Sequence, residues 1–424
     1  MNSKCQYFIW GAKNMKKILI IGAGLSKNFK DEYIFSVLKQ LPHDIFVAVP
    51  QESEGWLSEF VKPNNILRLD FSNLTDCISK ISCFCEINNI VFDAIFTFKE
   101  HFVCAASVIA QAFGCIYTPI NNIFKASNNK LLFRKHYNSL ANDYIIKADF
   151  QILDDRALLS DIQIPMVMKP FFGSSSCGVQ LVLPTTDIKH AVVSSKKSIA
   201  HKFDAALDRT FLLEKYISGK AFSIDGIIQN HKVHFAGINE YIYGPLPHFV
   251  QIGNIIPANI TKKEYKFCIK AMRQIVQHFG FNNMPFHAEV ILNDGKLFLI
   301  EIACRMPGGK IPRGYQLAYG FNFVEQVANL YLGLPVSFER KTNCQIIQKG
   351  KHIFNDCDIV SLKIPKSAFA QCDFAVITNA GSHNNYPDQN NPVYFYTVIS
   401  KSFKDAVRQS EQFEKQIRIK IRNT

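Results

Sequence analysis

Short apolar runs alternate with helix-like stretches over the first quarter of the chain, and this alternation constrains the fold more than any other feature. The apolar runs occupy residues 18–21, 45–49, 66–69 and 92–98, and helix-like stretches follow the first and the last of them. Strands that alternate with helices usually form a parallel sheet with helices packed on its faces. We therefore predict an α/β domain in this part of the chain.

The first apolar run ends in Gly22-Ala23-Gly24, and a Gly-x-Gly pattern after a strand also occurs in dinucleotide-binding sites. Such a site needs a third glycine and an acidic residue after the second strand. Lys27 stands at the third glycine position, and Pro50-Gln51 follows the second strand. We predict a tight strand-to-helix turn instead, which requires glycine for backbone reasons alone.

Composition excludes several classes of protein. The chain has 424 residues, of which 48% are hydrophobic and 20% charged, so disorder is excluded as its main state. This length suggests two to four domains. The formal net charge of +13 suits an anionic ligand. Because no recognised nucleic-acid motif accompanies the charge, we expect no nucleic-acid partner.

Cysteine usage and hydropathy bear on the compartment. The twelve cysteines are scattered, and the close pair Cys83 and Cys85 fits no usual zinc spacing. We expect buried, reduced thiols in a cytoplasmic protein. The N-terminus lacks a secretory apolar region, and no stretch approaches the roughly 18 apolar residues of a membrane span. We therefore expect no membrane partner.

The rest of the chain mixes strands and helices. Strands are predicted at residues 164–168, 211–215, 223–228, 232–238, 286–292 and 296–304, and helices at 130–140, 262–279 and 321–331. After Pro335 the pattern is strand-rich. Near the C-terminus Ile417, Ile419 and Ile421 alternate with basic residues, which predicts a last strand with a basic, solvated face.

A short loop bounded by Gly173 and Gly178 follows Lys169 and contains Ser174, Ser175 and Ser176. Backbone N–H groups of such a loop can point at phosphate oxygens without steric cost, and a lysine at the preceding strand end can reach the same phosphates. No Gly-Lys-Ser/Thr stands at the spacing of a Walker A motif. A phosphate-binding loop and an ordinary surface loop both remain open.

A second candidate lies in the hairpin around Asn293-Asp294-Gly295, which we expect to be a three-residue turn. In that register Glu289 pairs with Leu299, and Glu301 is its diagonal neighbour on the same face, roughly 7 Å away. Two carboxylates on an apolar hairpin repel each other unless a cation lies between them, and Mg²⁺ is the natural choice. Pairing of one carboxylate with Arg305 or a lysine is the alternative. A two-residue turn would place the glutamates on opposite faces.

The order of these pieces resembles the ATP-grasp superfamily. A lysine opens a helix at 130, a second lysine and the glycine-rich loop follow, and Leu-Glu-Lys-Tyr-Ile-Ser-Gly stands at 213–219. Ser-Ile-Asp-Gly at 223–226, His-Ala-Glu at 287–289 and Glu-Ile-Ala-Cys-Arg-Met-Pro-Gly-Gly at 301–309 complete the set. The last segment and the strand-rich C-terminal part look most like the L-amino-acid (dipeptide) ligases, a branch of carboxylate–amine ligases.

The resemblance implies an α/β protein with an ATP-grasp fold, an N-terminal Rossmann-like preATP-grasp domain and a strand-rich C-terminal domain. We expect an extension at 1–14, the preATP-grasp domain at 15–122, a small lobe with the glycine-rich loop at 123–210, a large lobe with the metal site at 211–335 and the C-terminal domain at 336–424.

The resemblance also implies a role for each site residue. Residues that would bind ATP are Lys130 and Lys169 at the phosphates or the adenine edge, Gly173, Ser174, Ser175, Ser176 and Gly178 over the β- and γ-phosphates, and Glu214, Tyr216 and Ile217 in the adenine pocket. Glu289 and Glu301 would hold Mg²⁺ or Mn²⁺. Arg305 would stabilise the transferred phosphoryl group and the acyl intermediate.

Some positions depart from the family pattern. Ala221 stands where members commonly have an acidic residue for the ribose. The dipeptide-ligase branch often has Glu and His in the stretch before Pro257, where this chain has Gln251 and Asn254. Lys310 follows the paired glycines where relatives often have Asp. The residues that we expect at the substrate are Gln251, Asn254, Gly308, Gly309 and Lys310.

The expected function is ATP-dependent ligation of a small-molecule carboxylate to an amine through an acyl phosphate, with release of ADP and phosphate. Two alternatives remain at this point. One keeps the fold and ATP but phosphorylates a small molecule, as a kinase does. The other is a non-catalytic ATP-binding protein, for which the substitutions at Ala221, Gln251 and Asn254 leave room. A homodimer is also left open.

Overall fold

The computed structural model describes residues 15–24, 29–53, 55–126, 129–140, 142–153, 163–173, 176–202, 210–370, 372–384, 386 and 391–423. The extension expected at 1–14 and the loop residues Ser174 and Ser175 lie outside this set. The chain divides into two compact units. The first reaches to Tyr117 and includes Tyr331–Gly333, and the second comprises Thr118–Leu330 and Leu334–Thr424.

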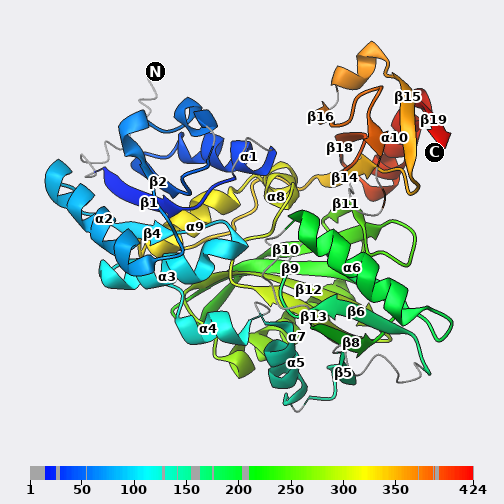
Figure 1. The fold of residues 1–424 in the computed structure, drawn as a ribbon, viewed down its shortest axis with the longest axis horizontal. Coiled ribbons are helices and arrows are strands. Elements are labelled where there is room, and N and C mark those ends of the chain that lie inside the picture. Colours follow the sequence, from blue (N-terminus) through cyan, green and yellow to red (C-terminus); the bar gives the residue numbers. More distant parts are fainter. Residues whose placement is uncertain are drawn as a thin grey trace, which may run out of the picture. The chain divides into compact units, whose positions relative to one another are not determined.

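The first unit contains a four-stranded parallel sheet, which confirms the prediction from the alternating pattern. The sheet order is β3-β2-β1-β4. Its elements are β1 (Lys16–Ile21), α1 (Phe29–Leu38), β2 (His43–Val49), β3 (Ile66–Arg68), α2 (Leu74–Asn88), β4 (Ala94–Phe96) and α3 (Val103–Ala112). Figure 1 shows them in blue and cyan. Helices α2 and α3 share one apolar core with the strands, so β1 reads as a continuous apolar run.

The turn after β1 has the tight geometry that the sequence predicted. Gly22 has a φ of 78°, and a Cβ atom there would overlap the ring of Phe102. The backbone N–H of Gly24 donates to Asp31 at 2.8 Å, and Lys99 also donates to this carboxylate. Glycine is therefore required at position 22 by backbone conformation and by the lack of space.

The second unit is built around an eight-stranded antiparallel sheet. Its order is β13-β12-β9-β10-β11-β14-β18-β16. The strands are β9 (Lys220–Gln229), β10 (Lys232–Tyr243), β11 (Gln251–Ile256), β12 (Met284–Asn293), β13 (Lys296–Ala303), β14 (Gln345–Lys351), β16 (Cys372–Val376) and β18 (Tyr394–Ser400). Strands β14, β16 and β18, which follow residue 336, thus extend the same sheet, with β14 hydrogen-bonded to β11.

Two smaller sheets complete the second unit. The first has the order β5-β8-β6-β7 and consists of β5 (Phe150–Leu153), β6 (Met166–Pro170), β7 (Gln180–Val182) and β8 (Phe211–Lys215). The second has the order β17-β15-β19, from β15 (Cys357–Lys363), β17 (His383–Asn384) and β19 (Arg418–Asn423). Arg418, Lys420 and Arg422 are exposed on β19, which confirms the predicted strand with a basic face.

Helices cover the sheets of the second unit. They are α4 (Ile120–Lys125), α5 (Lys130–Asn138), α6 (Ile188–Lys202), α7 (Lys262–Phe279), α8 (Ile311–Tyr319), α9 (Phe323–Tyr331, whose last residue is grouped with the first unit) and α10 (Phe403–Gln416). Short 3₁₀ turns lie at Gly55–Glu59, Pro63–Asn65, Glu100–Phe102 and Lys366–Ala370. Helix α6 buries Ala191 and Val192 against the four-stranded sheet (Figure 1).

Helix α7 matches its predicted limits because both ends carry strong local signals. Thr261 accepts from the N–H of Glu264, and Glu264 accepts from the N–H of Thr261, which is a capping box. Gly280 ends the helix with a φ of 67°. Cys268, Met272 and other residues of one face are buried, as an amphipathic helix requires.

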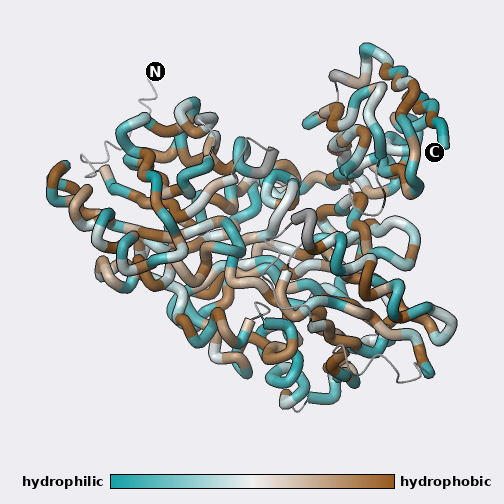
Figure 2. The backbone as a smooth tube through the Cα atoms, viewed as in Figure 1, coloured by the Kyte–Doolittle hydropathy of each residue, from teal (hydrophilic) through white to brown (hydrophobic). Residues whose placement is uncertain are grey.

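Hydropathy follows these layers. Figure 2 shows long brown segments in the sheet of the first unit and a shorter alternation of brown and teal in the C-terminal strands. Among the described residues, every helix falls short of the length and apolar character that a membrane crossing needs.

The capping box of α7 yields a stability prediction. Thr261→Ala removes the side-chain acceptor for the Glu264 N–H and should lower the free energy of unfolding by about 0.5–2 kcal/mol. Urea-induced unfolding followed by circular dichroism measures this. Thr261→Ser retains the hydroxyl and should unfold close to the wild-type midpoint. Equal midpoints for the alanine variant and the wild type would contradict the prediction.

Candidate functional site

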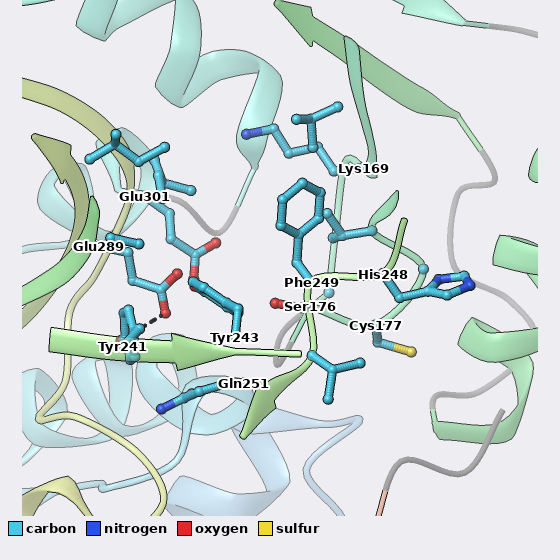
Figure 3. Close-up of a pocket in the computed structure, with 18 of the residues that line it drawn as sticks. Lys169, Ser176, Cys177, Tyr241, Tyr243, His248, Phe249, Gln251, Glu289 and Glu301 are labelled. Carbon is cyan, nitrogen blue, oxygen red and sulfur yellow. Dashed lines mark hydrogen bonds between the residues drawn. The ribbon is translucent and has the colours of Figure 1, made fainter. Parts of the chain in front are cut away.

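A cavity of about 620 Å³ lies in the second unit and is lined by residues of both the four-stranded and the eight-stranded sheets. Its walls contain every described residue that the sequence analysis assigned to a site, and Figure 3 shows several of them. These are Lys130, Lys169, Gly173, Ser176, Gly178, Glu214, Tyr216, Ile217, Gln251, Asn254, Glu289, Glu301, Arg305, Gly308, Gly309 and Lys310. Residues far apart in the sequence therefore meet in one pocket.

The hairpin of β12 and β13 has a two-residue turn, so the three-residue turn predicted for it was wrong. Asn293 pairs with Lys296, and the turn residues Asp294 and Gly295 have φ values of 45° and 72°. Two positive φ values are typical of the type I′ turn, whose twist matches that of the flanking strands. With unbroken register beyond this turn, the two glutamates would lie on opposite faces of the hairpin.

A β-bulge brings the two glutamates back to one face. Val290 pairs with Leu299, but the next pair is Glu289 with Glu301, so Ile300 is left out of the ladder. Directly paired residues of antiparallel strands point to the same side, and both carboxylates face the cavity (Figure 3). Leu299 was predicted to share their face; its pairing with Val290 puts it on the other one. One extra residue thus creates the carboxylate pair.

The two carboxylates retain access to the cavity, with 22% of the Glu289 side chain and 23% of the Glu301 side chain exposed. Lys130 Nζ lies 3.9 Å from Glu301 Oε2 and donates to the Gly173 carbonyl at 2.9 Å. A lysine thus approaches one carboxylate, as the alternative interpretation expected, but the distance between Lys130 and Glu301 is too long for a strong charge-assisted hydrogen bond.

A buried polar network supports Glu289 from below. His287 Nδ1 lies 2.6 Å from Asp225, and its Nε2 lies 3.4 Å from Glu289 Oε1. The Tyr241 hydroxyl donates to the same Oε1 at 3.2 Å, and the Tyr315 hydroxyl donates to Asp225 at 2.6 Å. The two partners of Glu289 in this network are themselves held in place, His287 by Asp225 and Tyr241 by its position on strand β10.

The charges in this network shift the pKa values of its members. Burial alone would lower the pKa of His287, but the carboxylates of Asp225 and Glu289 outweigh burial and raise it to about 9. Burial alone would raise the pKa of Glu289, but the contacts with His287 and Tyr241 outweigh it and lower that pKa. Glu289 is therefore held as an anion next to an imidazolium.

A second buried network includes Lys169, Glu214 and Arg134. Glu214 forms ion pairs with Lys169 and with Arg134, whose Nε and Nη2 lie 2.8 and 3.2 Å from the two carboxylate oxygens. Burial alone would raise the pKa of Glu214, but the charges of Arg134 and Lys169 outweigh it and hold that pKa below its usual value. Glu214 thus lines the cavity as an anion whose carboxylate is occupied by two cations.

The glycine-rich loop has a backbone that glycine makes possible. Gly173 and Gly178 have φ values of 137° and 71°, and Ser176 has a φ of 53°. A Cβ atom at Gly178 would lie 2.9 Å from Ile199 of α6, so the loop passes too close to this helix for a side chain. Cys177 donates to the Ser198 carbonyl of the same helix at 3.1 Å. The described part of the loop is therefore held against α6.

The segment that joins β8 to β9 also lines the cavity. The N–H of Tyr216 donates to the Pro165 carbonyl at 3.0 Å. Gly219 has a φ of 141°, and a Cβ atom there would lie 2.6 Å from the Leu292 carbonyl. Ala221 also borders the cavity, so the position at which the resemblance implies an acidic residue presents a methyl group.

The opposite wall is formed by neutral amides and aromatic rings. Gln251 donates to Asn254 Oδ1 at 2.7 Å, and Asn239 donates to the same oxygen at 3.2 Å. Tyr243 and Phe249 stand near Gln251 (Figure 3), and their ring centroids lie 6.4 Å apart. The amide pair is thus locked by hydrogen bonds to a deeper amide.

Cations lie where the chain leaves β13. Arg305 borders the cavity and donates to the Met306 carbonyl at 2.9 Å. Lys310 also borders the cavity, and its ammonium lies 3.6 Å from the ring centroid of Phe395, which is close enough for a cation–π contact. Gly308 and Gly309, which also border the cavity, add no side chain to this corner.

Sequence reasoning missed the residues that support the site from behind. Arg134 is fully buried and lies one helical turn after Lys130 on α5, and this i, i+4 spacing is the signal that could have found it. Tyr241 and Tyr315 were also missed, and Asp225 was part of the motif order but was given no role. An acidic residue inside the apolar run of β9 was the signal for Asp225.

Comparison with known families agrees with this geometry. Residues 162–312 match the family described as the ATP-grasp domain. This stretch of the chain is therefore assigned to the ATP-grasp family. The matched stretch contains the glycine-rich loop, the β8–β9 segment and both glutamates, so the resemblance seen in the order of the motifs is confirmed.

Curated relatives of this ATP-grasp chain include an amino-acid ligase and a related synthase. It is 23% identical over 250 residues to alanine–anticapsin ligase of Bacillus subtilis strain 168, which covers 55% of this chain and 52% of the ligase. It is 27% identical over 177 residues to dapdiamide A synthase of Enterobacter agglomerans, which covers 40% of this chain and 39% of the synthase. The chain thus spans about half the length, or less, of these relatives.

A solved structure shares the fold over almost the whole chain. The crystal structure of L-amino acid ligase from Bacillus licheniformis superposes with a TM-score of 0.77 at 18% identity, covering 97% of this chain and 100% of that one. The predicted α/β ATP-grasp fold with a strand-rich C-terminal part is therefore confirmed.

The buried ion pairs of Glu214 lead to a prediction about pH. Glu214→Gln leaves Arg134 and Lys169 without their carboxylate and should lower the free energy of unfolding by about 3–5 kcal/mol near pH 7. The folded-state pKa lies below the ordinary value of 4.5. The carboxylate therefore stabilises the fold above that value, and its contribution is lost as pH falls through the folded-state pKa.

Urea-induced unfolding of both proteins, from about pH 7 to about pH 3, tests this linkage. The difference between wild type and Glu214→Gln should shrink on the acid side. Glu411→Gln, on an exposed position of α10, serves as the control and should track the wild type. A difference that stays constant across the range would contradict the prediction.

Proposed function

We propose that this protein is an ATP-dependent carboxylate–amine ligase, which forms an amide or peptide bond through an acyl phosphate and releases ADP and phosphate. The observation that carries the proposal is the carboxylate pair Glu289 and Glu301, which faces lysines and a glycine-rich loop across one cavity. The alanine–anticapsin ligase among its relatives supports this reaction class.

The nucleotide would lie between the two halves of the cavity. Lys130, Lys169 and the loop from Gly173 to Gly178 would contact phosphates, since ammonium groups and N–H groups of a glycine-rich loop both attract phosphate oxygens. Adenine would enter beside Tyr216 and Ile217. Because Ala221 offers no acceptor, the ribose would be held by other groups.

The residues present fit a divalent cation. Glu289 and Glu301 supply paired carboxylate oxygens on a wall of the cavity, and oxygen ligands are those that Mg²⁺ and Mn²⁺ prefer, with phosphate and water completing the shell. Bound there, the cation would offset negative charge on the phosphates. His287 and Tyr241 hold the Glu289 carboxylate in orientation through hydrogen-bond contacts at its Oε1.

The reaction balances in two steps. A substrate carboxylate oxygen bonds to the γ-phosphorus, the bond from that phosphorus to the bridging oxygen breaks, and ADP leaves with the electron pair. The amine nitrogen then bonds to the acyl carbon, the carbon–oxygen bond to phosphate breaks, and the amine gives up a proton to water. Arg305 would stabilise the charge on the phosphoryl oxygens, and a closed cavity would keep water from the acyl phosphate.

The residues at the substrate end of the cavity suggest which charged group a substrate has. Gln251 and Asn254 present neutral amides, which cannot form an ion pair with an ammonium group. Gly308, Gly309 and Lys310 form a corner that, together with Arg305, is cationic. A substrate with a carboxylate group at this corner is therefore favoured.

Four segments of the chain would divide this work. Residues 123–210 and 211–335 would act as the small and large lobes around ATP. Residues 15–122 and 336–424 would be the preATP-grasp and C-terminal domains.

A phosphate-release screen with ATP and Mg²⁺ against pairs of amino acids tests the proposal, with mass spectrometry of the products. Phosphate and ADP released together, and only when an acid and an amine are both present, would support the ligase. ADP with a stable phosphorylated product would establish a kinase instead. Absence of any substrate-dependent ATP turnover would favour a non-catalytic ATP-binding protein.

The carboxylate pair gives a sharper prediction. Glu301→Gln keeps the shape of the side chain but removes its charge. Loss of an outer-shell partner of a metal typically costs about 10–100-fold in affinity or activity, so loss of a direct ligand should lower Mg-ATP turnover by at least that factor. Glu240→Gln on β10, outside the residues that line the cavity, is the matched control. Turnover of the Glu301 variant at the control level would overturn the metal assignment.

A further inference from the structure

The β-bulge that pairs Glu289 with Glu301 is held by a side chain from a different part of the second unit. This side chain is Arg134, which is fully buried on α5. We propose that Arg134 is a positioning residue that couples the metal carboxylate Glu301 to the phosphate-contacting Lys169 through the bulge carbonyls and Glu214. The inference deepens the proposed function and rests on it.

The first half of this coupling is the contact with the bulge. Arg134 Nη1 donates to the Leu299 carbonyl at 2.9 Å, and Nη2 donates to the Ile300 carbonyl at 3.1 Å. A bulge disrupts the local ladder, and buried carbonyls that lose ladder partners need other donors. Since Ile300 directly precedes Glu301, the guanidinium fixes the backbone from which the Glu301 carboxylate extends.

The second half is the contact with Glu214. Arg134 Nε and Nη2 bind the two oxygens of this carboxylate, and Lys169 binds it as well. Glu214 belongs to β8 and Lys169 to β6 of the four-stranded sheet, whereas the bulge belongs to β13 of the eight-stranded sheet. Figure 1 shows α5 beside β8 and β13. One guanidinium thus connects both walls of the cavity.

Only a planar fork of donors can make these contacts together. Arginine presents five N–H donors in a fixed plane, whereas lysine presents three from a single point. The carboxylate lies along one edge of the Arg134 guanidinium, and the two carbonyls lie against Nη1 and Nη2. A lysine at position 134 would retain the charge next to Glu214 but could not span both partners.

The surroundings of Arg134 show that it is held rigidly. Its guanidinium carbon lies 4.5 Å from the ring centroid of Phe298 and 5.1 Å from that of Tyr137. Complete burial of a charged side chain costs free energy unless the charge is paired and hydrogen-bonded. Apolar packing could fill this space at no greater cost, so geometry at the site is the use that accounts for a buried arginine.

Tyr137 provides a matched control on the same helix. Its hydroxyl accepts from the Leu299 N–H at 3.1 Å and lies 3.4 Å from the Leu297 carbonyl. It therefore also anchors β13 to α5, but its hydrogen bonds reach neither Ile300 nor Glu214. Tyr137→Phe removes a buried hydrogen bond to the same strand and leaves the Arg134 contacts in place.

The test measures binding directly. Mn²⁺ affinity in the presence of a non-hydrolysable ATP analogue is measured by electron paramagnetic resonance for wild type, Arg134→Lys, Arg134→Met and Tyr137→Phe. The Arg134 variants should bind Mn²⁺ about 10–100-fold more weakly, as is usual when outer-shell support of a metal ligand is lost. Their Kd for the analogue should rise as well, because Glu214, the partner of Lys169, is no longer held by the guanidinium.

The control variant separates positioning from general stability. Tyr137→Phe should lower the unfolding midpoint yet keep Mn²⁺ affinity within about twofold of the wild type. Arg134→Lys retains the charge that pairs with Glu214, so it keeps a folded protein available for measurement if Arg134→Met unfolds. Arg134→Lys with wild-type affinity for Mn²⁺ and the analogue would overturn the inference alone. A wild type that binds neither would overturn the proposed function and the inference together.

Discussion

Two like charges held opposite each other on an apolar hairpin are the constraint on which the rest of this site depends. Glu289 and Glu301 repel each other and lose hydration, so the surrounding residues must compensate. Tyr241 and the His287 imidazolium, itself paired with Asp225, contact Glu289, and Lys130 approaches Glu301. Both carboxylates also face the cavity, where the proposed divalent cation would offset their charge.

The sheet that carries this pair also shapes the substrate wall. Strand β11 lies between β10 and β14, so Asn254 pairs with Tyr241 on one side and with Gln348 on the other. Strands β14, β18 and β16 therefore complete the sheet that carries this wall of the pocket. The buried amide of Asn239 on this sheet donates to Asn254, which also accepts from Gln251, so this neutral wall is held in one orientation.

Much of the fold could be predicted from local signals. The continuous apolar strands of the first sheet, the capping box of α7 and the order of the ATP-grasp motifs are all visible in the sequence. The turn of the hairpin was predicted with the wrong length, and the bulge at Ile300 was not foreseen. These two errors cancelled, because an extra residue in β13 returned Glu301 to the face of Glu289.

By itself, the sequence determined which charged and glycine residues are present, where many of the strands and helices run, and the order of the motifs that resembles the ATP-grasp superfamily. These features depend on periodicity and turn chemistry, which act over a few residues. The tertiary structure decided the register at Glu301, the ion pairs of Glu214 and the burial of His287. Arg134 lies 166 positions from the Ile300 carbonyl that it binds, and contacts across such separations have no local signature. They arise only when two sheets close around one guanidinium.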